Sequence, residues 1–427
     1  MQIPIDRYTL PNGLRVVLSE DHSNPVVAVN LWYGVGSRNE RPGKTGFAHL
    51  FEHLMFQGSQ NVPDTQHMAH VERVGGSVNG STWLDRTNYF ETVPANRLEL
   101  ALWLESDRMG YFLPAITREK LDNQRAVVKN ERLQRVDNAP YGDWDERIQA
   151  MVFPPDHPYH HSVIGSMEDL DGATLDDVRD FFRTYYAPNN AVLTLCGDFD
   201  PAEARALVER WFGPIPRGPE VPPLPGRPDV PPRIGEEVRA RVEGDVALPR
   251  LYLGFRIPPY GTADFYALDV LTSLLATGKS SRLHRALVRE SRVAKDVGAF
   301  AFPIVTGASL LVVHSTASAG TPVETLEAAV LAELAALHAA PELPGEIERA
   351  VTGIEARHVV GIQQVAERAN DISMYTMLFD DPGRINTELD RYRAVTADDV
   401  RRVAREYLRA DNRAVLTYLP RAVREAA

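Results

Sequence analysis

The chain of 427 residues has one cysteine, no long apolar run and an excess of acidic over basic side chains. A single cysteine, Cys196, excludes an internal disulfide and a cysteine-based zinc site, and the apolar run before it indicates a buried thiol. No segment reaches the roughly 18 consecutive apolar residues that a membrane-spanning helix needs. The net charge of -12 also excludes a broadly basic surface for nucleic acid or for an anionic membrane.

Composition and the first residues bound the class of protein. Hydrophobic residues make up 44% of the chain and charged residues 24%, which is typical of a globular protein long enough for two or more domains. Residues 1–21 contain no cluster of Lys and Arg followed by an apolar segment. We therefore expect a cytoplasmic protein, and a periplasmic form whose leader has been removed fits the sequence as well.

Proline divides the chain into two related halves. Nine prolines lie between residues 214 and 232, and they predict a stiff, extended linker over 214–240 between domains at 1–213 and 241–427. The sequence TLDDVR at 174–179, followed by AVLT at 191–194, reappears as TADDVR at 396–401, followed by AVLT at 414–417. Each copy predicts an N-capped helix that leads into an apolar strand, so the halves are repeats.

Hydrophobic periodicity predicts strands and helices in both halves. The expected strands cover 14–18, 26–32, 77–92, 251–255 and 310–315, and the expected helices cover 46–56, 95–109, 265–276, 282–290 and 322–338. Because the two types mix without a regular βαβ alternation, each half is predicted to be an α+β layer structure. His67 and His70 have helical spacing but no acidic partner in the local pattern, so we expect them on a solvated helix face.

The strongest local signal is HLFEH at residues 49–53. On a helix, His49 and His53 lie one turn apart on the same face, where two imidazoles can bind one Zn2+. Glu52 lies on the adjoining edge, where it can act on a water at the metal. This H-x-x-E-H order is the inverse of the common zincin motif. A partly exposed polar face is the less favoured alternative, because the flanking Phe and Leu side chains would bury this helix and buried His and Glu need partners.

A catalytic zinc usually takes a third protein ligand, and here the sequence resembles a known family. The motif is similar to that of the family of pitrilysin, insulin-degrading enzyme and mitochondrial processing peptidase, in its short, two-domain branch. That family takes its third ligand from a downstream helix of the form E-R-x-V-V-x-x-E, and this chain reads QRAVVKNE at 124–131. The resemblance implies one Zn2+ per chain, held by His49, His53 and Glu131, with Glu52 as the general base of an endopeptidase.

Two details of this ligand set are open. Asp122 and Asp137 are the nearest other acids for the third position. Gln124 stands where the family has a glutamate that supports a ligand. An amide can hydrogen-bond a ligand, but it cannot raise the basicity of a histidine as a carboxylate does.

The resemblance also implies a fold and a mode of substrate binding. The fold would be two homologous α+β domains, each with a mixed, largely antiparallel sheet covered by helices, and the C-terminal domain would lack metal ligands. The sequence GGSVNGST at 75–82 is similar to the family's edge strand, to which a peptide adds as a further β-strand within a closed chamber. Asn79, Gly80 and Ser81 are the expected substrate-binding residues.

The family's active members also use an Arg and, seven residues later, a Tyr, which donate to the substrate carbonyl. Val288 and Lys295 stand at these positions, and a shift by one residue offers Arg289 but puts Asp296 at the tyrosine position. We therefore expect a homologous, non-zinc subunit that supplies the Arg/Tyr pair, with a homodimer left open. The rival interpretation is a catalytically weak peptide-binding or structural subunit of the same family.

Overall fold

The computed structural model describes residues 2–339 and 343–421, which form two compact units. Unit 1 comprises the chain up to Glu131 together with Ser162–Pro225 and Arg357–Glu388. Unit 2 comprises Arg132–His161, Gly226–Ala356 and the chain from Leu389 onward.

These units are not the two continuous halves of the sequence. Residues 132–161 precede the proline-rich linker but belong to unit 2, and residues 357–388 follow it but belong to unit 1. Each half therefore gives one segment to the unit built mainly from the other half. The sequence repeat divides the chain into 1–213, 214–240 and 241–427. As a division into domains, these bounds stay a prediction. The linker residues 214–236 contain no helix or strand, as their prolines require.

The sheet of unit 1 has six strands in the order β1-β2-β6-β3-β5-β4, and only β2 and β6 are parallel. Their bounds are β1 Asp6–Thr9, β2 Arg15–Glu20, β3 Val26–Tyr33, β4 Ser77–Thr82, β5 Thr87–Pro94 and β6 Ala191–Gly197. The single strand predicted over 77–92 is wrong: residues 83–86 form a turn, closed by a bond from Trp83 N to Arg86 O of 2.8 Å. β4 lies at the edge of this sheet.

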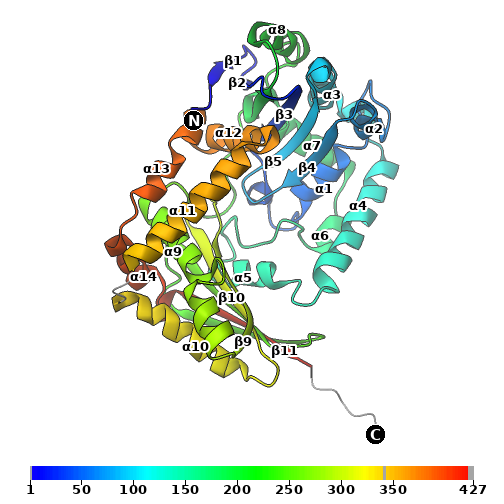
Figure 1. Ribbon diagram of the computed structural model, residues 1–427. Helices are drawn as coiled ribbons and strands as arrows, with labels where there is room; N and C mark the ends of the chain where they lie inside the picture. The colour runs from blue at the N-terminus through cyan, green and yellow to red at the C-terminus, as the bar shows by residue number, and fades with distance from the viewer. Residues whose placement is uncertain (1, 340–342, 422–427) are drawn as a thin grey trace. The chain divides into compact units, whose positions relative to one another are not determined.

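Helices cover both faces of this sheet. α12 (Val365–Phe379), drawn in orange in Figure 1, packs on β3 and β6, and Ser373 donates to Thr194 there at 2.8 Å. On the other face Phe51 of α1 lies 4.4 Å from the ring of Tyr186 within the main apolar core. The remaining helices of this unit are α1 Phe47–Leu54, α2 Gln66–Arg73, α3 Leu98–Tyr111, α4 Arg118–Arg132, α6 Met167–Asp171, α7 Leu175–Tyr185 and α8 Pro201–Phe212.

The five-stranded sheet of unit 2 repeats the topology of strands β2 to β6 in the first sheet. Its strands are β7 Glu237–Gly244, β8 Arg250–Ile257, β9 Ala294–Ala301, β10 Ser309–Ala317 and β11 Arg413–Pro420, in the order β7-β11-β8-β10-β9. Counted along the chain, the first and last strands pair in parallel, as β2 and β6 do in unit 1. α5 (Trp144–Val152) packs on β8 and β11, as α12 does on the first sheet. The predicted mixed, largely antiparallel α+β fold is confirmed.

The other helices of unit 2 agree with most of the expected positions. They are α9 Ala263–Ala276, α10 Val323–Ala336 and α14 Ala397–Tyr407, with a π-helical segment at His284–Glu290. α11 (Leu343–Ile362) and α13 (Glu388–Arg393) lie mostly in unit 2, and residues 357–362 and 388 of these helices belong to unit 1. Thr174 and Thr396 form capping boxes at the starts of α7 and α14, as the repeat predicts. Cys196 is buried in β6. Within the described ranges, no helix is long and apolar enough to cross a membrane.

Candidate metal and peptide site

The helix α1 separates its apolar and polar side chains onto different faces. Phe47, Leu50, Phe51 and Leu54 are buried in the core, which fixes the orientation of the helix. The opposite face carries the three polar residues of the motif, which are only partly buried: His49, Glu52 and His53. The imidazole rings of His49 and His53 are 4.8 Å apart, at an angle of 82°.

Glu131, near the end of α4, meets both histidines. Its Oε2 lies 3.7 Å from His49 Nε2 and 3.4 Å from His53 Nε2, and one ligand atom from each of the three residues lies within 4.8 Å of the others. Tetrahedral zinc with bonds of about 2.0–2.1 Å holds its ligand atoms roughly 3.3 Å apart. The two imidazoles and the carboxylate therefore fit a zinc ion with little movement.

Contacts of α4 hold Glu131 in place. Lys120 donates to the carbonyl of Gln57, just beyond α1, at 2.6 Å. Arg125 donates to the carbonyls of Leu170 and Ala173 at 2.8 and 2.7 Å. These bonds fix α4 against the segment after α1 and against α6, so the third candidate ligand is presented by a fixed helix.

The other acids near this position are engaged elsewhere. Asp122 pairs with Arg125 at 2.8 Å and Asp137 pairs with Arg132 at 3.5 Å. Gln124 is buried on α4, and its expected role in supporting a ligand stays a prediction.

Glu52 is held between α1 and the edge strand. Thr82 Oγ1 donates to Glu52 Oε2 at 2.6 Å. A Cβ at Gly80 would lie 3.3 Å from Glu52 Cγ and 3.1 Å from Phe56, so a glycine lets β4 pass this close to the helix. Burial raises the pKa of Glu52, while the hydrogen bond from Thr82 and the charges of His53 and Arg86 act in the opposite direction.

The three predicted substrate-binding residues lie on β4, beside Glu52. β4 pairs with β5 on one side, and its other side is the edge of the sheet. Asn79 is exposed, and its Oδ1 accepts the N–H of Gly80 at 2.9 Å. The carbonyl of Ser81 accepts a bond of 2.7 Å from Arg86. The structure thus brings the edge strand and the candidate metal ligands to one side of unit 1.

Sequence reasoning missed a buried charged cluster on the same unit. His67 is buried rather than solvated as expected, and its Nε2 lies 2.5 Å from Glu91 Oε1. Glu105 of α3 completes the set, bonded to Arg108, whose guanidinium lies 4.2 Å over the ring of Tyr89. The partners of His67 come from β5 and α3, so no local pattern could show them. The available signal was the group of charged residues Glu105, Asp107 and Arg108 within a largely apolar helix.

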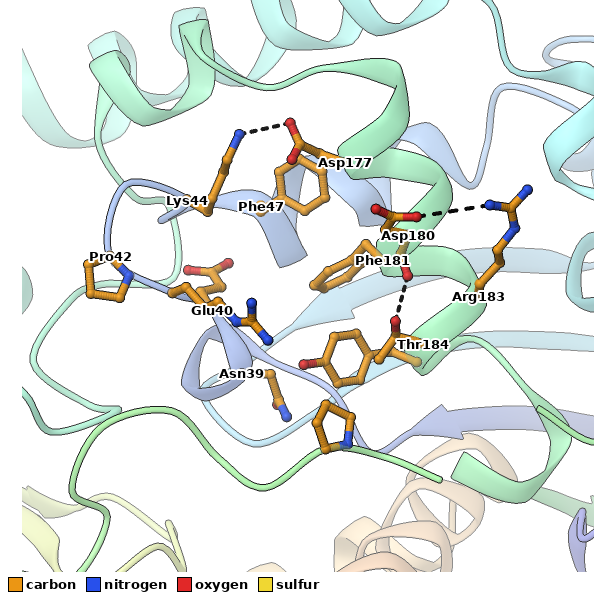
Figure 2. Close-up of a pocket in the computed structure, with 13 residues that line it drawn as sticks. Asn39, Glu40, Pro42, Lys44, Phe47, Asp177, Asp180, Phe181, Arg183 and Thr184 are labelled. Carbon is orange, nitrogen blue, oxygen red and sulfur yellow. Dashed lines mark hydrogen bonds and ion pairs between the residues drawn. The ribbon is translucent and has the colours of Figure 1, made fainter. Parts of the chain in front are cut away.

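A pocket of about 580 Å3 opens beside the N-terminal end of α1 (Figure 2). Lys44 pairs with Asp177 across it at 2.8 Å, and Arg183 lies 3.9 Å from Asp180. Glu40 and the aromatic rings of α1 and α7 form its wall. Its charged groups are largely paired with one another.

The positions of the expected Arg/Tyr pair lie in unit 2. Val288 is within the π-helical segment and Lys295 is an exposed residue of β9. Arg289 and Asp296, the pair in the shifted register, lie beside them in the same two elements.

Comparison with known proteins assigns the family. The insulinase (peptidase family M16) model matches residues 15–152, and the peptidase M16 inactive domain model matches residues 172–354. Zinc protease PqqE of Helicobacter pylori is 29% identical over 405 residues, which cover 94% of this chain and 89% of that protein. An uncharacterized zinc protease of Streptomyces coelicolor is 27% identical over 95% of this chain and 87% of its own length.

Solved structures agree with this assignment. The crystal structure of a protease from Helicobacter pylori matches with a TM-score of 0.91 at 27% identity, covering 98% of this chain and all of that chain. The peptidase M16 inactive domain from Pseudomonas fluorescens matches with a TM-score of 0.85 at 18% identity over 99% of both chains, which is a likeness of fold. The chain belongs to the pitrilysin family, peptidase family M16, and is of its two-domain type.

Proposed function

We propose that this chain is the zinc-binding subunit of a metalloendopeptidase that hydrolyses peptides or unfolded polypeptide segments. The observation that carries the proposal is the convergence of His49, His53 and Glu131, whose ligand atoms lie within 4.8 Å of one another. The names of relatives as zinc proteases support both a peptidase and zinc as its metal.

The chain's own residues would divide the remaining work. Zn2+ bound by the three ligands would supply Lewis-acid chemistry at the scissile carbonyl. Glu52 would accept the proton of the attacking water and return it to the leaving amine, with Thr82 holding its Oε2 in place. Strand β4 would pair with the backbone of the substrate, and Asn79 would release the N–H of Gly80 as the new strand forms.

A homologous subunit would complete the oxyanion site. Val288 and Lys295 stand where the family has its Arg/Tyr pair, and loss of one preorganised donor typically lowers turnover by about 100-fold to 1000-fold. We therefore propose a heterodimer with a non-zinc subunit, with a homodimer as the alternative. A cytoplasmic location, or a periplasmic one, stays a prediction.

The alternative function is a catalytically weak peptide-binding or structural subunit, which the match of residues 172–354 to an inactive-domain model favours. The complete set of three ligands and a base argues for the enzyme.

The deciding measurements are the zinc content of the purified chain and its hydrolysis of a quenched peptide, alone and with a homologous subunit. Glu52→Gln should keep zinc and peptide binding and lose hydrolysis. Loss of zinc in this variant would make Glu52 a ligand. Zinc binding by the wild-type chain without hydrolysis, both alone and with the homologous subunit, would favour the structural subunit.

A further inference from the structure

The N-terminus of the candidate zinc helix is capped by a side chain that lies outside the helix. α1 begins after Gly46, which has no side chain to cap it. Glu40, six residues earlier, fills this role with both carboxylate oxygens. Its Oε2 accepts the N–H of Gly46 at 2.9 Å and its Oε1 accepts that of Ala48 at 2.7 Å, and the N–H of Phe47 also donates to this carboxylate.

This cap acts directly on the metal-binding face. The first N–H groups of a helix have no partner within it and carry partial positive charge, so a buried carboxylate aimed at them complements both properties. α1 has only eight residues, and His49 lies in its first turn with His53 one turn later. A change in the direction of the first turn therefore moves both imidazoles relative to Glu131.

The chain on the other side of this helix start is fixed by close backbone packing. Gly46 has φ of +80°, and a Cβ there would lie 2.4 Å from the carbonyl oxygen of Ile164. A Cβ at Gly165 would lie 2.1 Å from Gly46 N. Thr45 donates its N–H and hydroxyl to Asp169 at 2.9 and 2.6 Å. Glu40 thus bonds both this fixed segment, at Gly46, and the first turn of α1, at Ala48.

We propose that Glu40 is a positioning residue of the metal centre, which sets the direction of α1 so that His49 and His53 face Glu131. This inference rests on the proposed zinc function. Figure 2 shows Glu40 at the wall of the pocket beside the start of α1, but only 5% of its surface is exposed, which is consistent with a role directed at the helix.

The test compares Glu40→Gln with a matched cap variant in the same unit. Asp200 caps α8 by accepting the N–H groups of Ala202 and Glu203, both at 2.9 Å, and α8 carries no predicted ligand. Glu40→Gln keeps the side-chain length but turns one acceptor into an NH2 group that faces a backbone donor. We expect it to lower zinc affinity of the full chain, measured by competition with a chelator, about tenfold or more. Asp200→Ala removes this cap, so it should lower the Tm of the metal-free chain and leave zinc affinity within about twofold.

Shortening the carboxylate gives a second measurement. Glu40→Asp keeps the carboxyl group but cannot reach both Gly46 and Ala48, so we expect a smaller loss of zinc affinity. This variant replaces the first test if Glu40→Gln does not fold. Zinc affinity equal to wild type in whichever of these variants folds, or an equal loss in Asp200→Ala, would overturn the role of Glu40. Failure of the wild-type chain to bind zinc would instead overturn the proposed function itself.

Discussion

Thr82 Oγ1 donates a hydrogen bond to Glu52 Oε2 over 2.6 Å, and this bond joins the end of β4 to the middle of α1. One oxygen of the proposed base is therefore fixed by the strand that would bind the substrate. The position of the base and the position of the peptide backbone depend on the same element, so a substrate strand that pairs with β4 is automatically aligned with Glu52.

Thr82→Val removes this bond at nearly constant volume. Hydrogen bonds to charged groups contribute about 1.5–3 kcal/mol, so we expect kcat to fall about tenfold or more, with zinc content and KM close to wild type. Steady-state kinetics on a quenched peptide, with the homologous subunit present, would measure this. Thr82→Ser should restore most of the activity, because it retains the hydroxyl. An unchanged kcat in Thr82→Val would show that the orientation of Glu52 does not depend on this bond.

Glu131→Ala should lower zinc affinity sharply, because it removes the only carboxylate that the structure brings to within 4 Å of both histidines in the described part of the chain. Metal content after dialysis against a chelator is the measurement, with far-UV circular dichroism as the check on folding. Asp122→Ala, on the same helix, is the matched control and should keep its zinc. Undiminished zinc in Glu131→Ala would require a different third ligand.

The sequence could predict the parts of this site that follow from local periodicity. The spacing of His49, Glu52 and His53 places them on one helix face, and the structure shows that face opposite the buried Phe and Leu side chains. Glu131 comes from a helix far along the chain, so its meeting with the histidines depends on tertiary packing and could be expected only from the family resemblance. The hairpin at 83–86 was missed because β-forming residues continue on both sides of it.

Other features were beyond local patterns for the same physical reason. The exchange of residues 132–161 and 357–388 between the units depends on which sheet α5 and α12 cover, and the sequence of a helix does not state which sheet it meets. The cap from Glu40 depends on the turn at 41–44, which brings Gly46 back to this side chain. His67 has the spacing of a surface residue, but its helix lies over β4 and α3, which buries it.

The buried cluster around Glu91 predicts a pH dependence of stability. Burial raises the pKa of Glu91 to about 7, with the charge of Arg108 and a bond with Glu105 acting against this rise, and burial lowers the pKa of His67 to about 3. A carboxyl group whose pKa is higher in the folded state binds its proton more tightly there than in the unfolded chain. Its contribution to the unfolding free energy is complete below the unfolded pKa, near 4.5, and is lost as the pH rises to about 7. The contribution of Glu91 to unfolding free energy should therefore fall between pH 5 and pH 8.

Glu91→Gln tests this directly, because an amide does not titrate. Relative to this variant, the wild-type chain should lose about 2 kcal/mol of unfolding free energy from pH 5 to pH 8, given about 1.4 kcal/mol per pKa unit. Denaturant unfolding at several pH values gives the difference. Glu99→Gln, at an exposed position of α3, is the control and should track the wild type. A constant difference between wild type and Glu91→Gln across this range would mean that Glu91 does not hold a proton in the folded chain.

The last prediction concerns the missing oxyanion donors. With Val288 in the π-helical segment and Lys295 on β9, the purified chain should bind zinc and peptide but hydrolyse slowly, because the developing oxyanion lacks the Arg and Tyr donors of the family. Adding a homologous subunit that carries the pair should raise activity at least about tenfold, the effect of even one recovered donor, and native mass spectrometry should show a mixed assembly. The same subunit with its Arg and Tyr replaced by Ala and Phe is the control, which should assemble without the gain. Full activity of the chain as a homo-oligomer, unchanged by either subunit, would contradict this division of labour and direct attention to Arg289 or Lys295 as the source of the missing charge.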